Sequence, residues 1–78
     1  MFLEIITPEH KLYEGKITYA KFPGFEGEFG VLNNHAPIIS NLSGGHIEVT
    51  DTNNEKKSFK ISGGVVEILE NKIIVLAD

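Results

Sequence analysis

The sequence predicts an all-β protein, a two-sheet β-sandwich of roughly eight to ten short strands with essentially no helix. Two observations support this fold class. Short runs of β-branched and aromatic residues are separated by glycine, proline and asparagine, and several runs alternate apolar and polar residues with a period of two. No window sustains an apolar stripe of helical period over three turns.

Eight runs are expected to form the strands, and they leave no room for a linker or a second domain. In run 46–50, Ile47 and Val49 share one face, and in run 57–61 Phe59 and Ile61 point inward while Lys60 points outward. Residues 1–78 are therefore expected to form one domain. The expected strands are 2–7, 16–22, 28–32, 36–42, 46–50, 57–61, 65–69 and 72–76.

The segments between these runs carry turn chemistry. Asp51-Thr52-Asn53-Asn54 tolerates left-handed backbone and is expected to form a hairpin, and Glu70-Asn71 a tighter one. The pairs Gly44-Gly45 and Gly63-Gly64 precede strands, where a bulge, a corner or a close backbone approach is expected.

Composition restricts the classes of function. With 78 residues, the chain buries only roughly 60–65% of its unfolded surface, and it has no cysteine to reinforce the core. Acidic residues outnumber basic ones by 11 to 7, and every basic residue is a lysine. The absence of arginine disfavours nucleic-acid binding and phosphate chemistry that needs a guanidinium group.

The sequence favours a cytosolic protein that meets a membrane only through other proteins. No apolar run approaches the roughly 20 residues that span a bilayer. An acid at Glu4 comes too early for a secretory signal.

The glycines Gly24, Gly27 and Gly30 recur every three residues, as in some phosphate-binding loops. A dinucleotide-binding pattern needs a helix directly after its glycines, but a β run containing Pro37 follows, and no Gly-Lys-Ser/Thr occurs. We therefore expect an irregular loop with unusual backbone angles.

No catalytic or metal site is expected. The histidines His10, His35 and His46 lie in separate segments without ligand spacing. Glu26 and Glu28 share one face of a strand, but a sandwich this small rarely encloses a pocket for acid–base chemistry. The serines that lack a Gly-x-Ser-x-Gly context are Ser40, Ser43, Ser58 and Ser62.

Five motifs in order resemble the epsilon subunit of bacterial F-type ATP synthases. Residues 22–37 read FPGFEGEFGVLNNHAP, which contains the family's Gly-x-Glu-Gly-x-Phe/Leu-Gly-hydrophobic run followed by His-Ala-Pro. Downstream, LSGG at 42–45, FKISGGVVE at 59–67 and IIVLAD at 73–78 are similar to later family segments. The resemblance covers the whole chain.

The resemblance implies a non-catalytic rotor subunit without a catalytic residue, cofactor or metal of its own. In this family the β-sandwich stands at the foot of the central stalk, against the gamma subunit and the membrane c-ring, and couples ion-driven rotation to ATP synthesis. It would lie on the cytoplasmic face of the bacterial inner membrane, as a peripheral part of the complex. By position, Glu26, Gly27 and Glu28 face the c-ring, and His35, Ala36 and Pro37 face gamma.

The charges of Glu26 and Glu28 are compatible with a position against the c-ring. Their carboxylates can pair with basic groups in the ring's polar loops, although exposed pairs contribute only about 0–1 kcal/mol each. The acids are therefore expected to set register, while apolar contact supplies affinity. For His35, a structural hydrogen bond at a strand start and a direct partner contact remain two open readings.

The sequence departs from the family pattern at its C-terminus. Typical epsilon subunits continue into a helical hairpin that restrains ATP hydrolysis, whereas this chain ends at Asp78. We expect either a naturally short member or a chain cut at the domain boundary. The start at Met1 and the untagged end favour a short member, one that couples the rotor without helical-arm inhibition.

Two other function classes compete with this reading. A lipoyl- or biotinyl-type carrier domain would place a modified lysine at a hairpin tip, where Lys56 or Lys57 could stand, but the flanking residues differ from carrier motifs. A small enzyme or sugar-binding sandwich would need aromatic residues clustered on a concave face. The aromatic residues, expected mostly in the core or at an interface, are Tyr13, Tyr19, Phe22, Phe25, Phe29 and Phe59.

Overall fold

The computed structural model describes residues 1–33 and 36–78, which form eight strands and no helix. This confirms the predicted all-β class. The strands are β1 (Phe2–Ile6), β2 (Lys11–Gly24), β3 (Gly27–Val31), β4 (Ile38–Leu42), β5 (Gly45–Asp51), β6 (Lys56–Ile61), β7 (Gly64–Leu69) and β8 (Lys72–Ala77).

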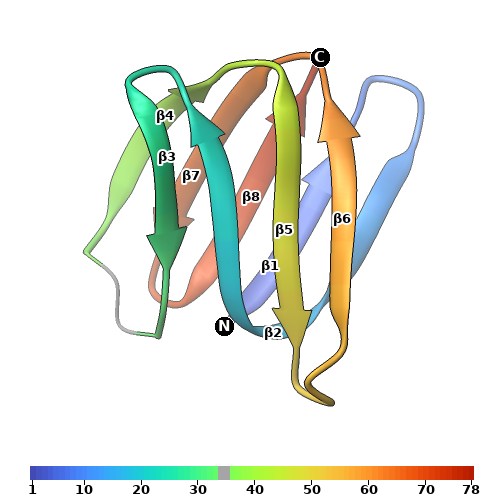
Figure 1. The fold of residues 1–78 in the computed structure, drawn as a ribbon, viewed down its shortest axis with the longest axis vertical. Coiled ribbons are helices and arrows are strands. Elements are labelled where there is room, and N and C mark those ends of the chain that lie inside the picture. The colour runs from blue at the N-terminus through green and yellow to red at the C-terminus, as the bar shows by residue number, and fades with distance from the viewer. Residues whose placement is uncertain (34–35) are drawn as a thin grey trace.

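The strands form two packed layers that are joined through β2 (Figure 1). The front layer consists of β3, the second half of β2, β5 and β6, and the back layer of β4, β7, β8, β1 and the first half of β2. The hydrogen-bonded order is β1-β8-β7-β4-β2-β5-β6, with β3 on β2 and a further β1–β2 pairing. Only β1–β8 is parallel among these pairings of the described strands.

Strand β2 is longer than the sequence predicted. It has 14 residues, whereas the expected strand began at residue 16. The part from Lys11 to Gly15 shows no simple alternation, yet it pairs along β1, with Leu3 opposite Gly15 and Ile5 opposite Tyr13. The register then shifts between Ile17 and Tyr19, where β2 begins to pair with β5. Such a shift bends a strand, so one strand serves both layers.

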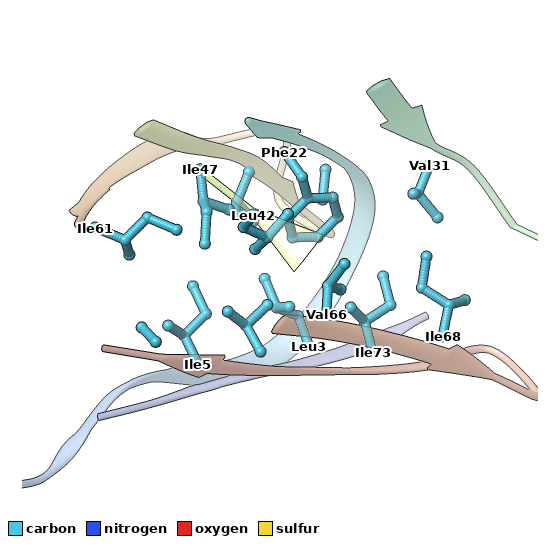
Figure 2. Close-up of a cluster of buried hydrophobic side chains, with 14 of the residues drawn as sticks. Leu3, Ile5, Phe22, Val31, Leu42, Ile47, Ile61, Val66, Ile68 and Ile73 are labelled. Carbon is cyan, nitrogen blue, oxygen red and sulfur yellow. The ribbon is translucent and has the colours of Figure 1, made fainter. Parts of the chain in front are cut away.

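Apolar side chains from the two layers meet in a single core. Figure 2 shows Phe22 and Ile47 of the front layer directed toward Leu3, Ile5 and Ile73 of the back layer. In the part of the chain that the structure describes, no polar or charged residue is buried. The fully or almost fully buried residues are Leu3, Ile5, Ile17, Ala20, Phe22, Val31, Leu42, Ile47, Val49, Ile61, Val66, Ile68, Ile73, Val75 and Ala77.

The predicted hairpin turns are confirmed. Asp51 accepts hydrogen bonds at Oδ1 from the N–H groups of Asn53 (2.8 Å) and Glu55 (2.9 Å), and Asn54 has a φ of 65°. Glu70 and Asn71 have φ angles of 51° and 62°, as in a two-residue turn of left-handed residues between β7 and β8.

Candidate docking surfaces

The segment expected to be an irregular loop is a tight hairpin, so that expectation was wrong. Gly24 pairs with Gly27, and only Phe25 and Glu26 lie between the two strands. The reason is local: Gly27 has a φ of 127°, which lets the chain reverse within two residues. The sequence contained a signal for this hairpin. Two glycines flank the two turn residues, and alternation follows in 28–32.

The acidic residues at this tip differ in their partners. Glu26 lies in the turn, Gly27 and Glu28 begin β3, and all three are exposed. Glu28 reaches the Lys21 ammonium at 3.7 Å, and Glu48 reaches it at 3.5 Å. These two carboxylates raise the pKa of Lys21. Glu26 takes part in none of the ion pairs among residues 1–33 and 36–78, so its charge is available to a partner.

The residues expected to face gamma lie at the other end of the same side of the sandwich. Ala36 and Pro37 are exposed and directly precede β4, while His35 lies outside the described residues. They are separated from the Phe25-Glu26 turn by the length of β3, which is about 16 Å for five residues (Figure 1). The structure therefore does not bring the two predicted contact segments together.

A third surface was missed by the sequence analysis: the outward side of the back layer carries seven apolar side chains, which are interspersed with charged ones such as Glu4, Glu67 and Lys72. We call it the back face. Strand register places Ile39 beside Glu67 and Glu67 beside Ile74, while Val65 lies beside Leu76. Its apolar members are Phe2, Ile6, Ile39, Val65, Leu69, Ile74 and Leu76.

Several residues of the back face are strongly exposed. The exposed fraction is 72% for Ile39, 57% for Leu76 and 52% for Leu69. The signal in the sequence was the run of consecutive apolar residues in 73–77, because a strand with one solvent-exposed face alternates apolar and polar residues instead. The outward side of the front layer does alternate, and its members include His46, Glu48, Thr50, Lys56, Ser58 and Lys60.

Open grooves follow strand β4 and continue onto the back face. One, of about 470 Å³, lies between the Phe25-Glu26 turn and β4 and reaches Ile39. Another, of about 360 Å³, runs from Pro37 past Ile39 to Leu69, and a third, of about 270 Å³, lies between Leu69 and Ile74. Glu67 lines the last two grooves. These features suit contact with a macromolecule better than enclosure of a small substrate.

The competing function classes find no support in the geometry. Lys56 and Lys57 lie within β6 rather than at a turn, and Lys57 pairs with Asp51 (3.3 Å) and Glu55 (3.6 Å). Tyr13 packs on Phe59 and Phe22 on Phe29, with ring centroids 5.2 and 5.6 Å apart. These four aromatic residues therefore serve packing, whereas Phe25 is 73% exposed.

The described residues show neither a metal-binding cluster nor a membrane-spanning helix. Within 1–33 and 36–78, no three His, Asp or Glu side chains are grouped so that they could hold a metal ion. No helix in that part of the chain is long and apolar enough to cross a bilayer.

Comparison with known proteins gives one consistent family. Residues 1–78 match the family model described as the ATP synthase delta/epsilon chain, beta-sandwich domain. The ATP synthase epsilon chain of Campylobacter curvus is 41% identical over 78 residues, which is 100% of this chain and 60% of that protein. That of Pelotomaculum thermopropionicum is 42% identical over 97% of this chain and 56% of its own length. The chain thus spans less than two thirds of these relatives.

Two solved structures share the fold. A chain in the cryo-EM structure of the Euglena gracilis mitochondrial ATP synthase, which includes the c-ring, superposes with a TM-score of 0.90 at 22% identity, over 96% of this chain and 48% of that one. A chain in the central stalk and c-ring structure of the Tetrahymena thermophila mitochondrial ATP synthase gives 0.79 at 17% identity, over 99% of this chain and 62% of that one. None of these comparisons points to a carrier domain.

Proposed function

This chain belongs to the family of ATP synthase delta/epsilon β-sandwich domains, and from that premise we propose that it acts as a non-catalytic rotor subunit of an F-type ATP synthase. The observation that carries the proposal is the family match over all of residues 1–78. In this role the subunit links gamma to the c-ring, so that ion-driven rotation of the ring is coupled to ATP synthesis elsewhere in the complex. It is a peripheral component on the cytoplasmic face of the bacterial inner membrane.

The Phe25-Glu26 turn is the proposed contact with the c-ring. Glu26 forms no ion pair with any residue of 1–33 and 36–78, and Phe25 offers an exposed aromatic ring beside it. Glu28 contributes less charge, because Lys21 already compensates it. The turn thus combines one acid that can set register with apolar area that can supply affinity.

The segment that precedes β4 is the proposed contact with gamma. Ala36 and Pro37 are exposed there, and the groove from Pro37 to Leu69 begins beside them. His35 belongs to the same proposed contact. Since this segment and the turn lie at opposite ends of β3, the two partners can bind at once without competing for residues.

The test is co-purification of the tagged protein with gamma and with the c-ring from cells that contain the complex. We expect the unaltered protein to retain both, and Glu26→Lys to retain gamma but lose most of the ring because like charges would meet. Glu55→Lys, in the β5–β6 turn at the other end of the molecule, serves as the charge-matched control (Figure 1). Failure of the unaltered protein to retain gamma would contradict the proposal.

A further inference from the structure

Strand β6 forms a free edge of the front layer. It pairs with β5 on one side and with no described strand on the other. Figure 1 shows it at the opposite end of that layer from β3. Alternate N–H and C=O groups of an edge strand point away from its sheet, so β6 presents a row of backbone groups with which an extended segment of another chain can pair.

The side chains of β6 carry positive charge that the rest of the molecule balances only in part. The protein has a formal net charge of −4, yet three of its seven lysines, Lys56, Lys57 and Lys60, lie in this strand, which contains no acid. Lys57 is compensated by Asp51 (3.3 Å) and Glu55 (3.6 Å). Lys56 and Lys60 take part in none of the ion pairs among the described residues, so both ammonium groups are available to a partner.

The two available lysines lie on the outward side of the strand. Lys56, Ser58 and Lys60 alternate along it, so the lysines are about 13 Å apart along β6. An open groove of about 310 Å³ lies beside Lys56 and Ser58 and crosses β5 to Tyr19. Glu48 also lines this groove, but its carboxylate lies 3.5 Å from the ammonium of a β2 lysine. The outward side of β6 therefore offers two positive positions at a fixed spacing, with room beside one of them.

The inward side of the same edge is apolar. Phe59 packs on Tyr13 of the back layer, with ring centroids 5.2 Å apart. Both residues are only partly buried, so aromatic surface remains at this margin of the sandwich. A strand added beside β6 places every second side chain on the inward side. It therefore meets lysines on one side and this aromatic pair on the other.

We propose that the edge of β6 binds an extended, acidic segment of another protein by strand addition. The register of β6 specifies the pattern of that segment: two acids four positions apart, opposite Lys56 and Lys60, and an apolar residue opposite Phe59. Backbone hydrogen bonds supply affinity, and the two lysines select acidic sequences. This inference does not depend on the proposed function, because it uses neither the Phe25-Glu26 turn nor the segment before β4.

A second copy of this chain fits the edge less well. Two β6 strands paired with each other bring their lysines together, and like charges so placed oppose association. Strand β3 is the other edge of the front layer, but it contains one acid, Glu28, instead of two acids four positions apart. That acid is already 3.7 Å from the ammonium of Lys21. The lysines of β6 thus reject the same edge of another copy and favour a separate acidic strand.

The experiment titrates the isotope-labelled protein with the synthetic peptide Thr-Glu-Val-Thr-Val-Glu-Thr and follows its backbone amides by NMR. The peptide has the required pattern in either strand direction. We expect saturable shifts of the β5 and β6 amides, with a Kd on the order of 1 mM. Glutamine in place of both glutamates is expected to weaken binding at least about fivefold. Proline at the three central positions keeps both acids but removes three N–H groups, and is expected to abolish binding.

Charge reversal tests the two lysines directly. The double variant Lys56→Glu and Lys60→Glu is expected to lose the acidic peptide and to bind the peptide with lysine in place of both glutamates. The matched control is Lys16→Glu with Lys72→Glu, because these exposed lysines lie opposite Phe2 in the back layer. At about 0.15 M salt it is expected to keep the affinity for the acidic peptide within about threefold.

Each contrary result overturns a part of the proposal. Equal binding of the proline peptide would overturn strand addition, and so would inorganic phosphate that moved the same amides with the same affinity. An equal loss in the control variant would overturn the choice of edge. Shifts of the β6 amides that grew with protein concentration alone would show a second copy as the partner instead. No binding of the acidic peptide at about ten times the expected Kd would overturn the proposal as a whole.

Discussion

At the scale of single residues, two glycines share a left-handed backbone but differ in their surroundings. Gly64 has a φ of 149°, and a Cβ added there would come within 2.9 Å of the Cα of Ala77. Gly27 has a φ of 127°, and an added Cβ would meet nothing within 4 Å. The first position therefore combines backbone strain with a collision, and the second has strain alone.

We expect Gly64→Ala to lower the free energy of unfolding by about 3 kcal/mol or more, and Gly27→Ala by only about 1 kcal/mol. Urea unfolding monitored by circular dichroism measures both. Equal losses at the two positions would show that the close packing of β7 against β8 does not matter.

Asp51 makes stability depend on pH. The N–H groups of Glu55 and Asn53 and the Lys57 ammonium hold the pKa of Asp51 below its ordinary value of 3.8. A carboxyl with a lowered folded pKa stabilises the protein above its unfolded pKa, and this contribution is lost as the pH falls through the folded value. The loss is therefore expected below about pH 4.

Asp51→Asn provides the comparison, because its amide oxygen still accepts hydrogen bonds in the turn but does not titrate. The variant is expected to lose less stability than the unaltered protein between about pH 6 and pH 2. Urea midpoints across this range measure the difference. The same decline in both proteins would contradict the role given to Asp51.

At the scale of elements, the β7–β8 turn is not built from optimal residues. Glu70 adopts a φ of 51°, which asparagine tolerates better than glutamate. We expect Glu70→Asn to raise the free energy of unfolding by about 0.5 kcal/mol. The exposed Glu9→Asn, outside the left-handed region, is the control and should change it little. A loss of stability with Glu70→Asn would indicate that the Glu70 side chain has a role of its own.

The same elements explain how far the sequence predicts the fold. The alternation of apolar and polar residues in 46–50 and 57–61 placed Ile47, Val49 and Ile61 inward correctly, since one face of these strands is exposed to solvent. The start of β2 was missed because Lys11 to Gly15 form a strand through pairing with β1, a long-range effect that local pattern does not contain.

The candidate site was predicted unevenly for a related reason. Family motifs identified Glu26 and Pro37 because these residues belong to short recognisable stretches. The back face is assembled from four strands, so Ile39 and Leu76 become neighbours of one surface only through strand pairing. The roles of Glu26, Gly27, Glu28, His35, Ala36 and Pro37 stay predictions.

At the scale of the whole molecule, the difference between the polar front side and the more apolar back side predicts how the purified protein binds to a hydrophobic column. We expect the double variant Ile39→Lys and Leu76→Lys to elute much earlier from a hydrophobic interaction column. Its free energy of unfolding should change by only about 1 kcal/mol, because both side chains are exposed. Ser58→Lys, on the polar side, should elute like the unaltered protein. Collapse of the fold in the double variant would mean that the back face belongs to the core.

The passage of β2 through both layers has a mechanical consequence. A torque that enters at the Phe25-Glu26 turn and is resisted on the back face would act as shear between the layers. Two layers held only by apolar packing can slide, but here one strand is bonded to β5 and β3 in the front and to β1 in the back. Sliding would have to stretch the covalent chain of β2 and tear its hydrogen bonds. The sandwich is therefore expected to transmit torque as a rigid body, with little deformation between its layers.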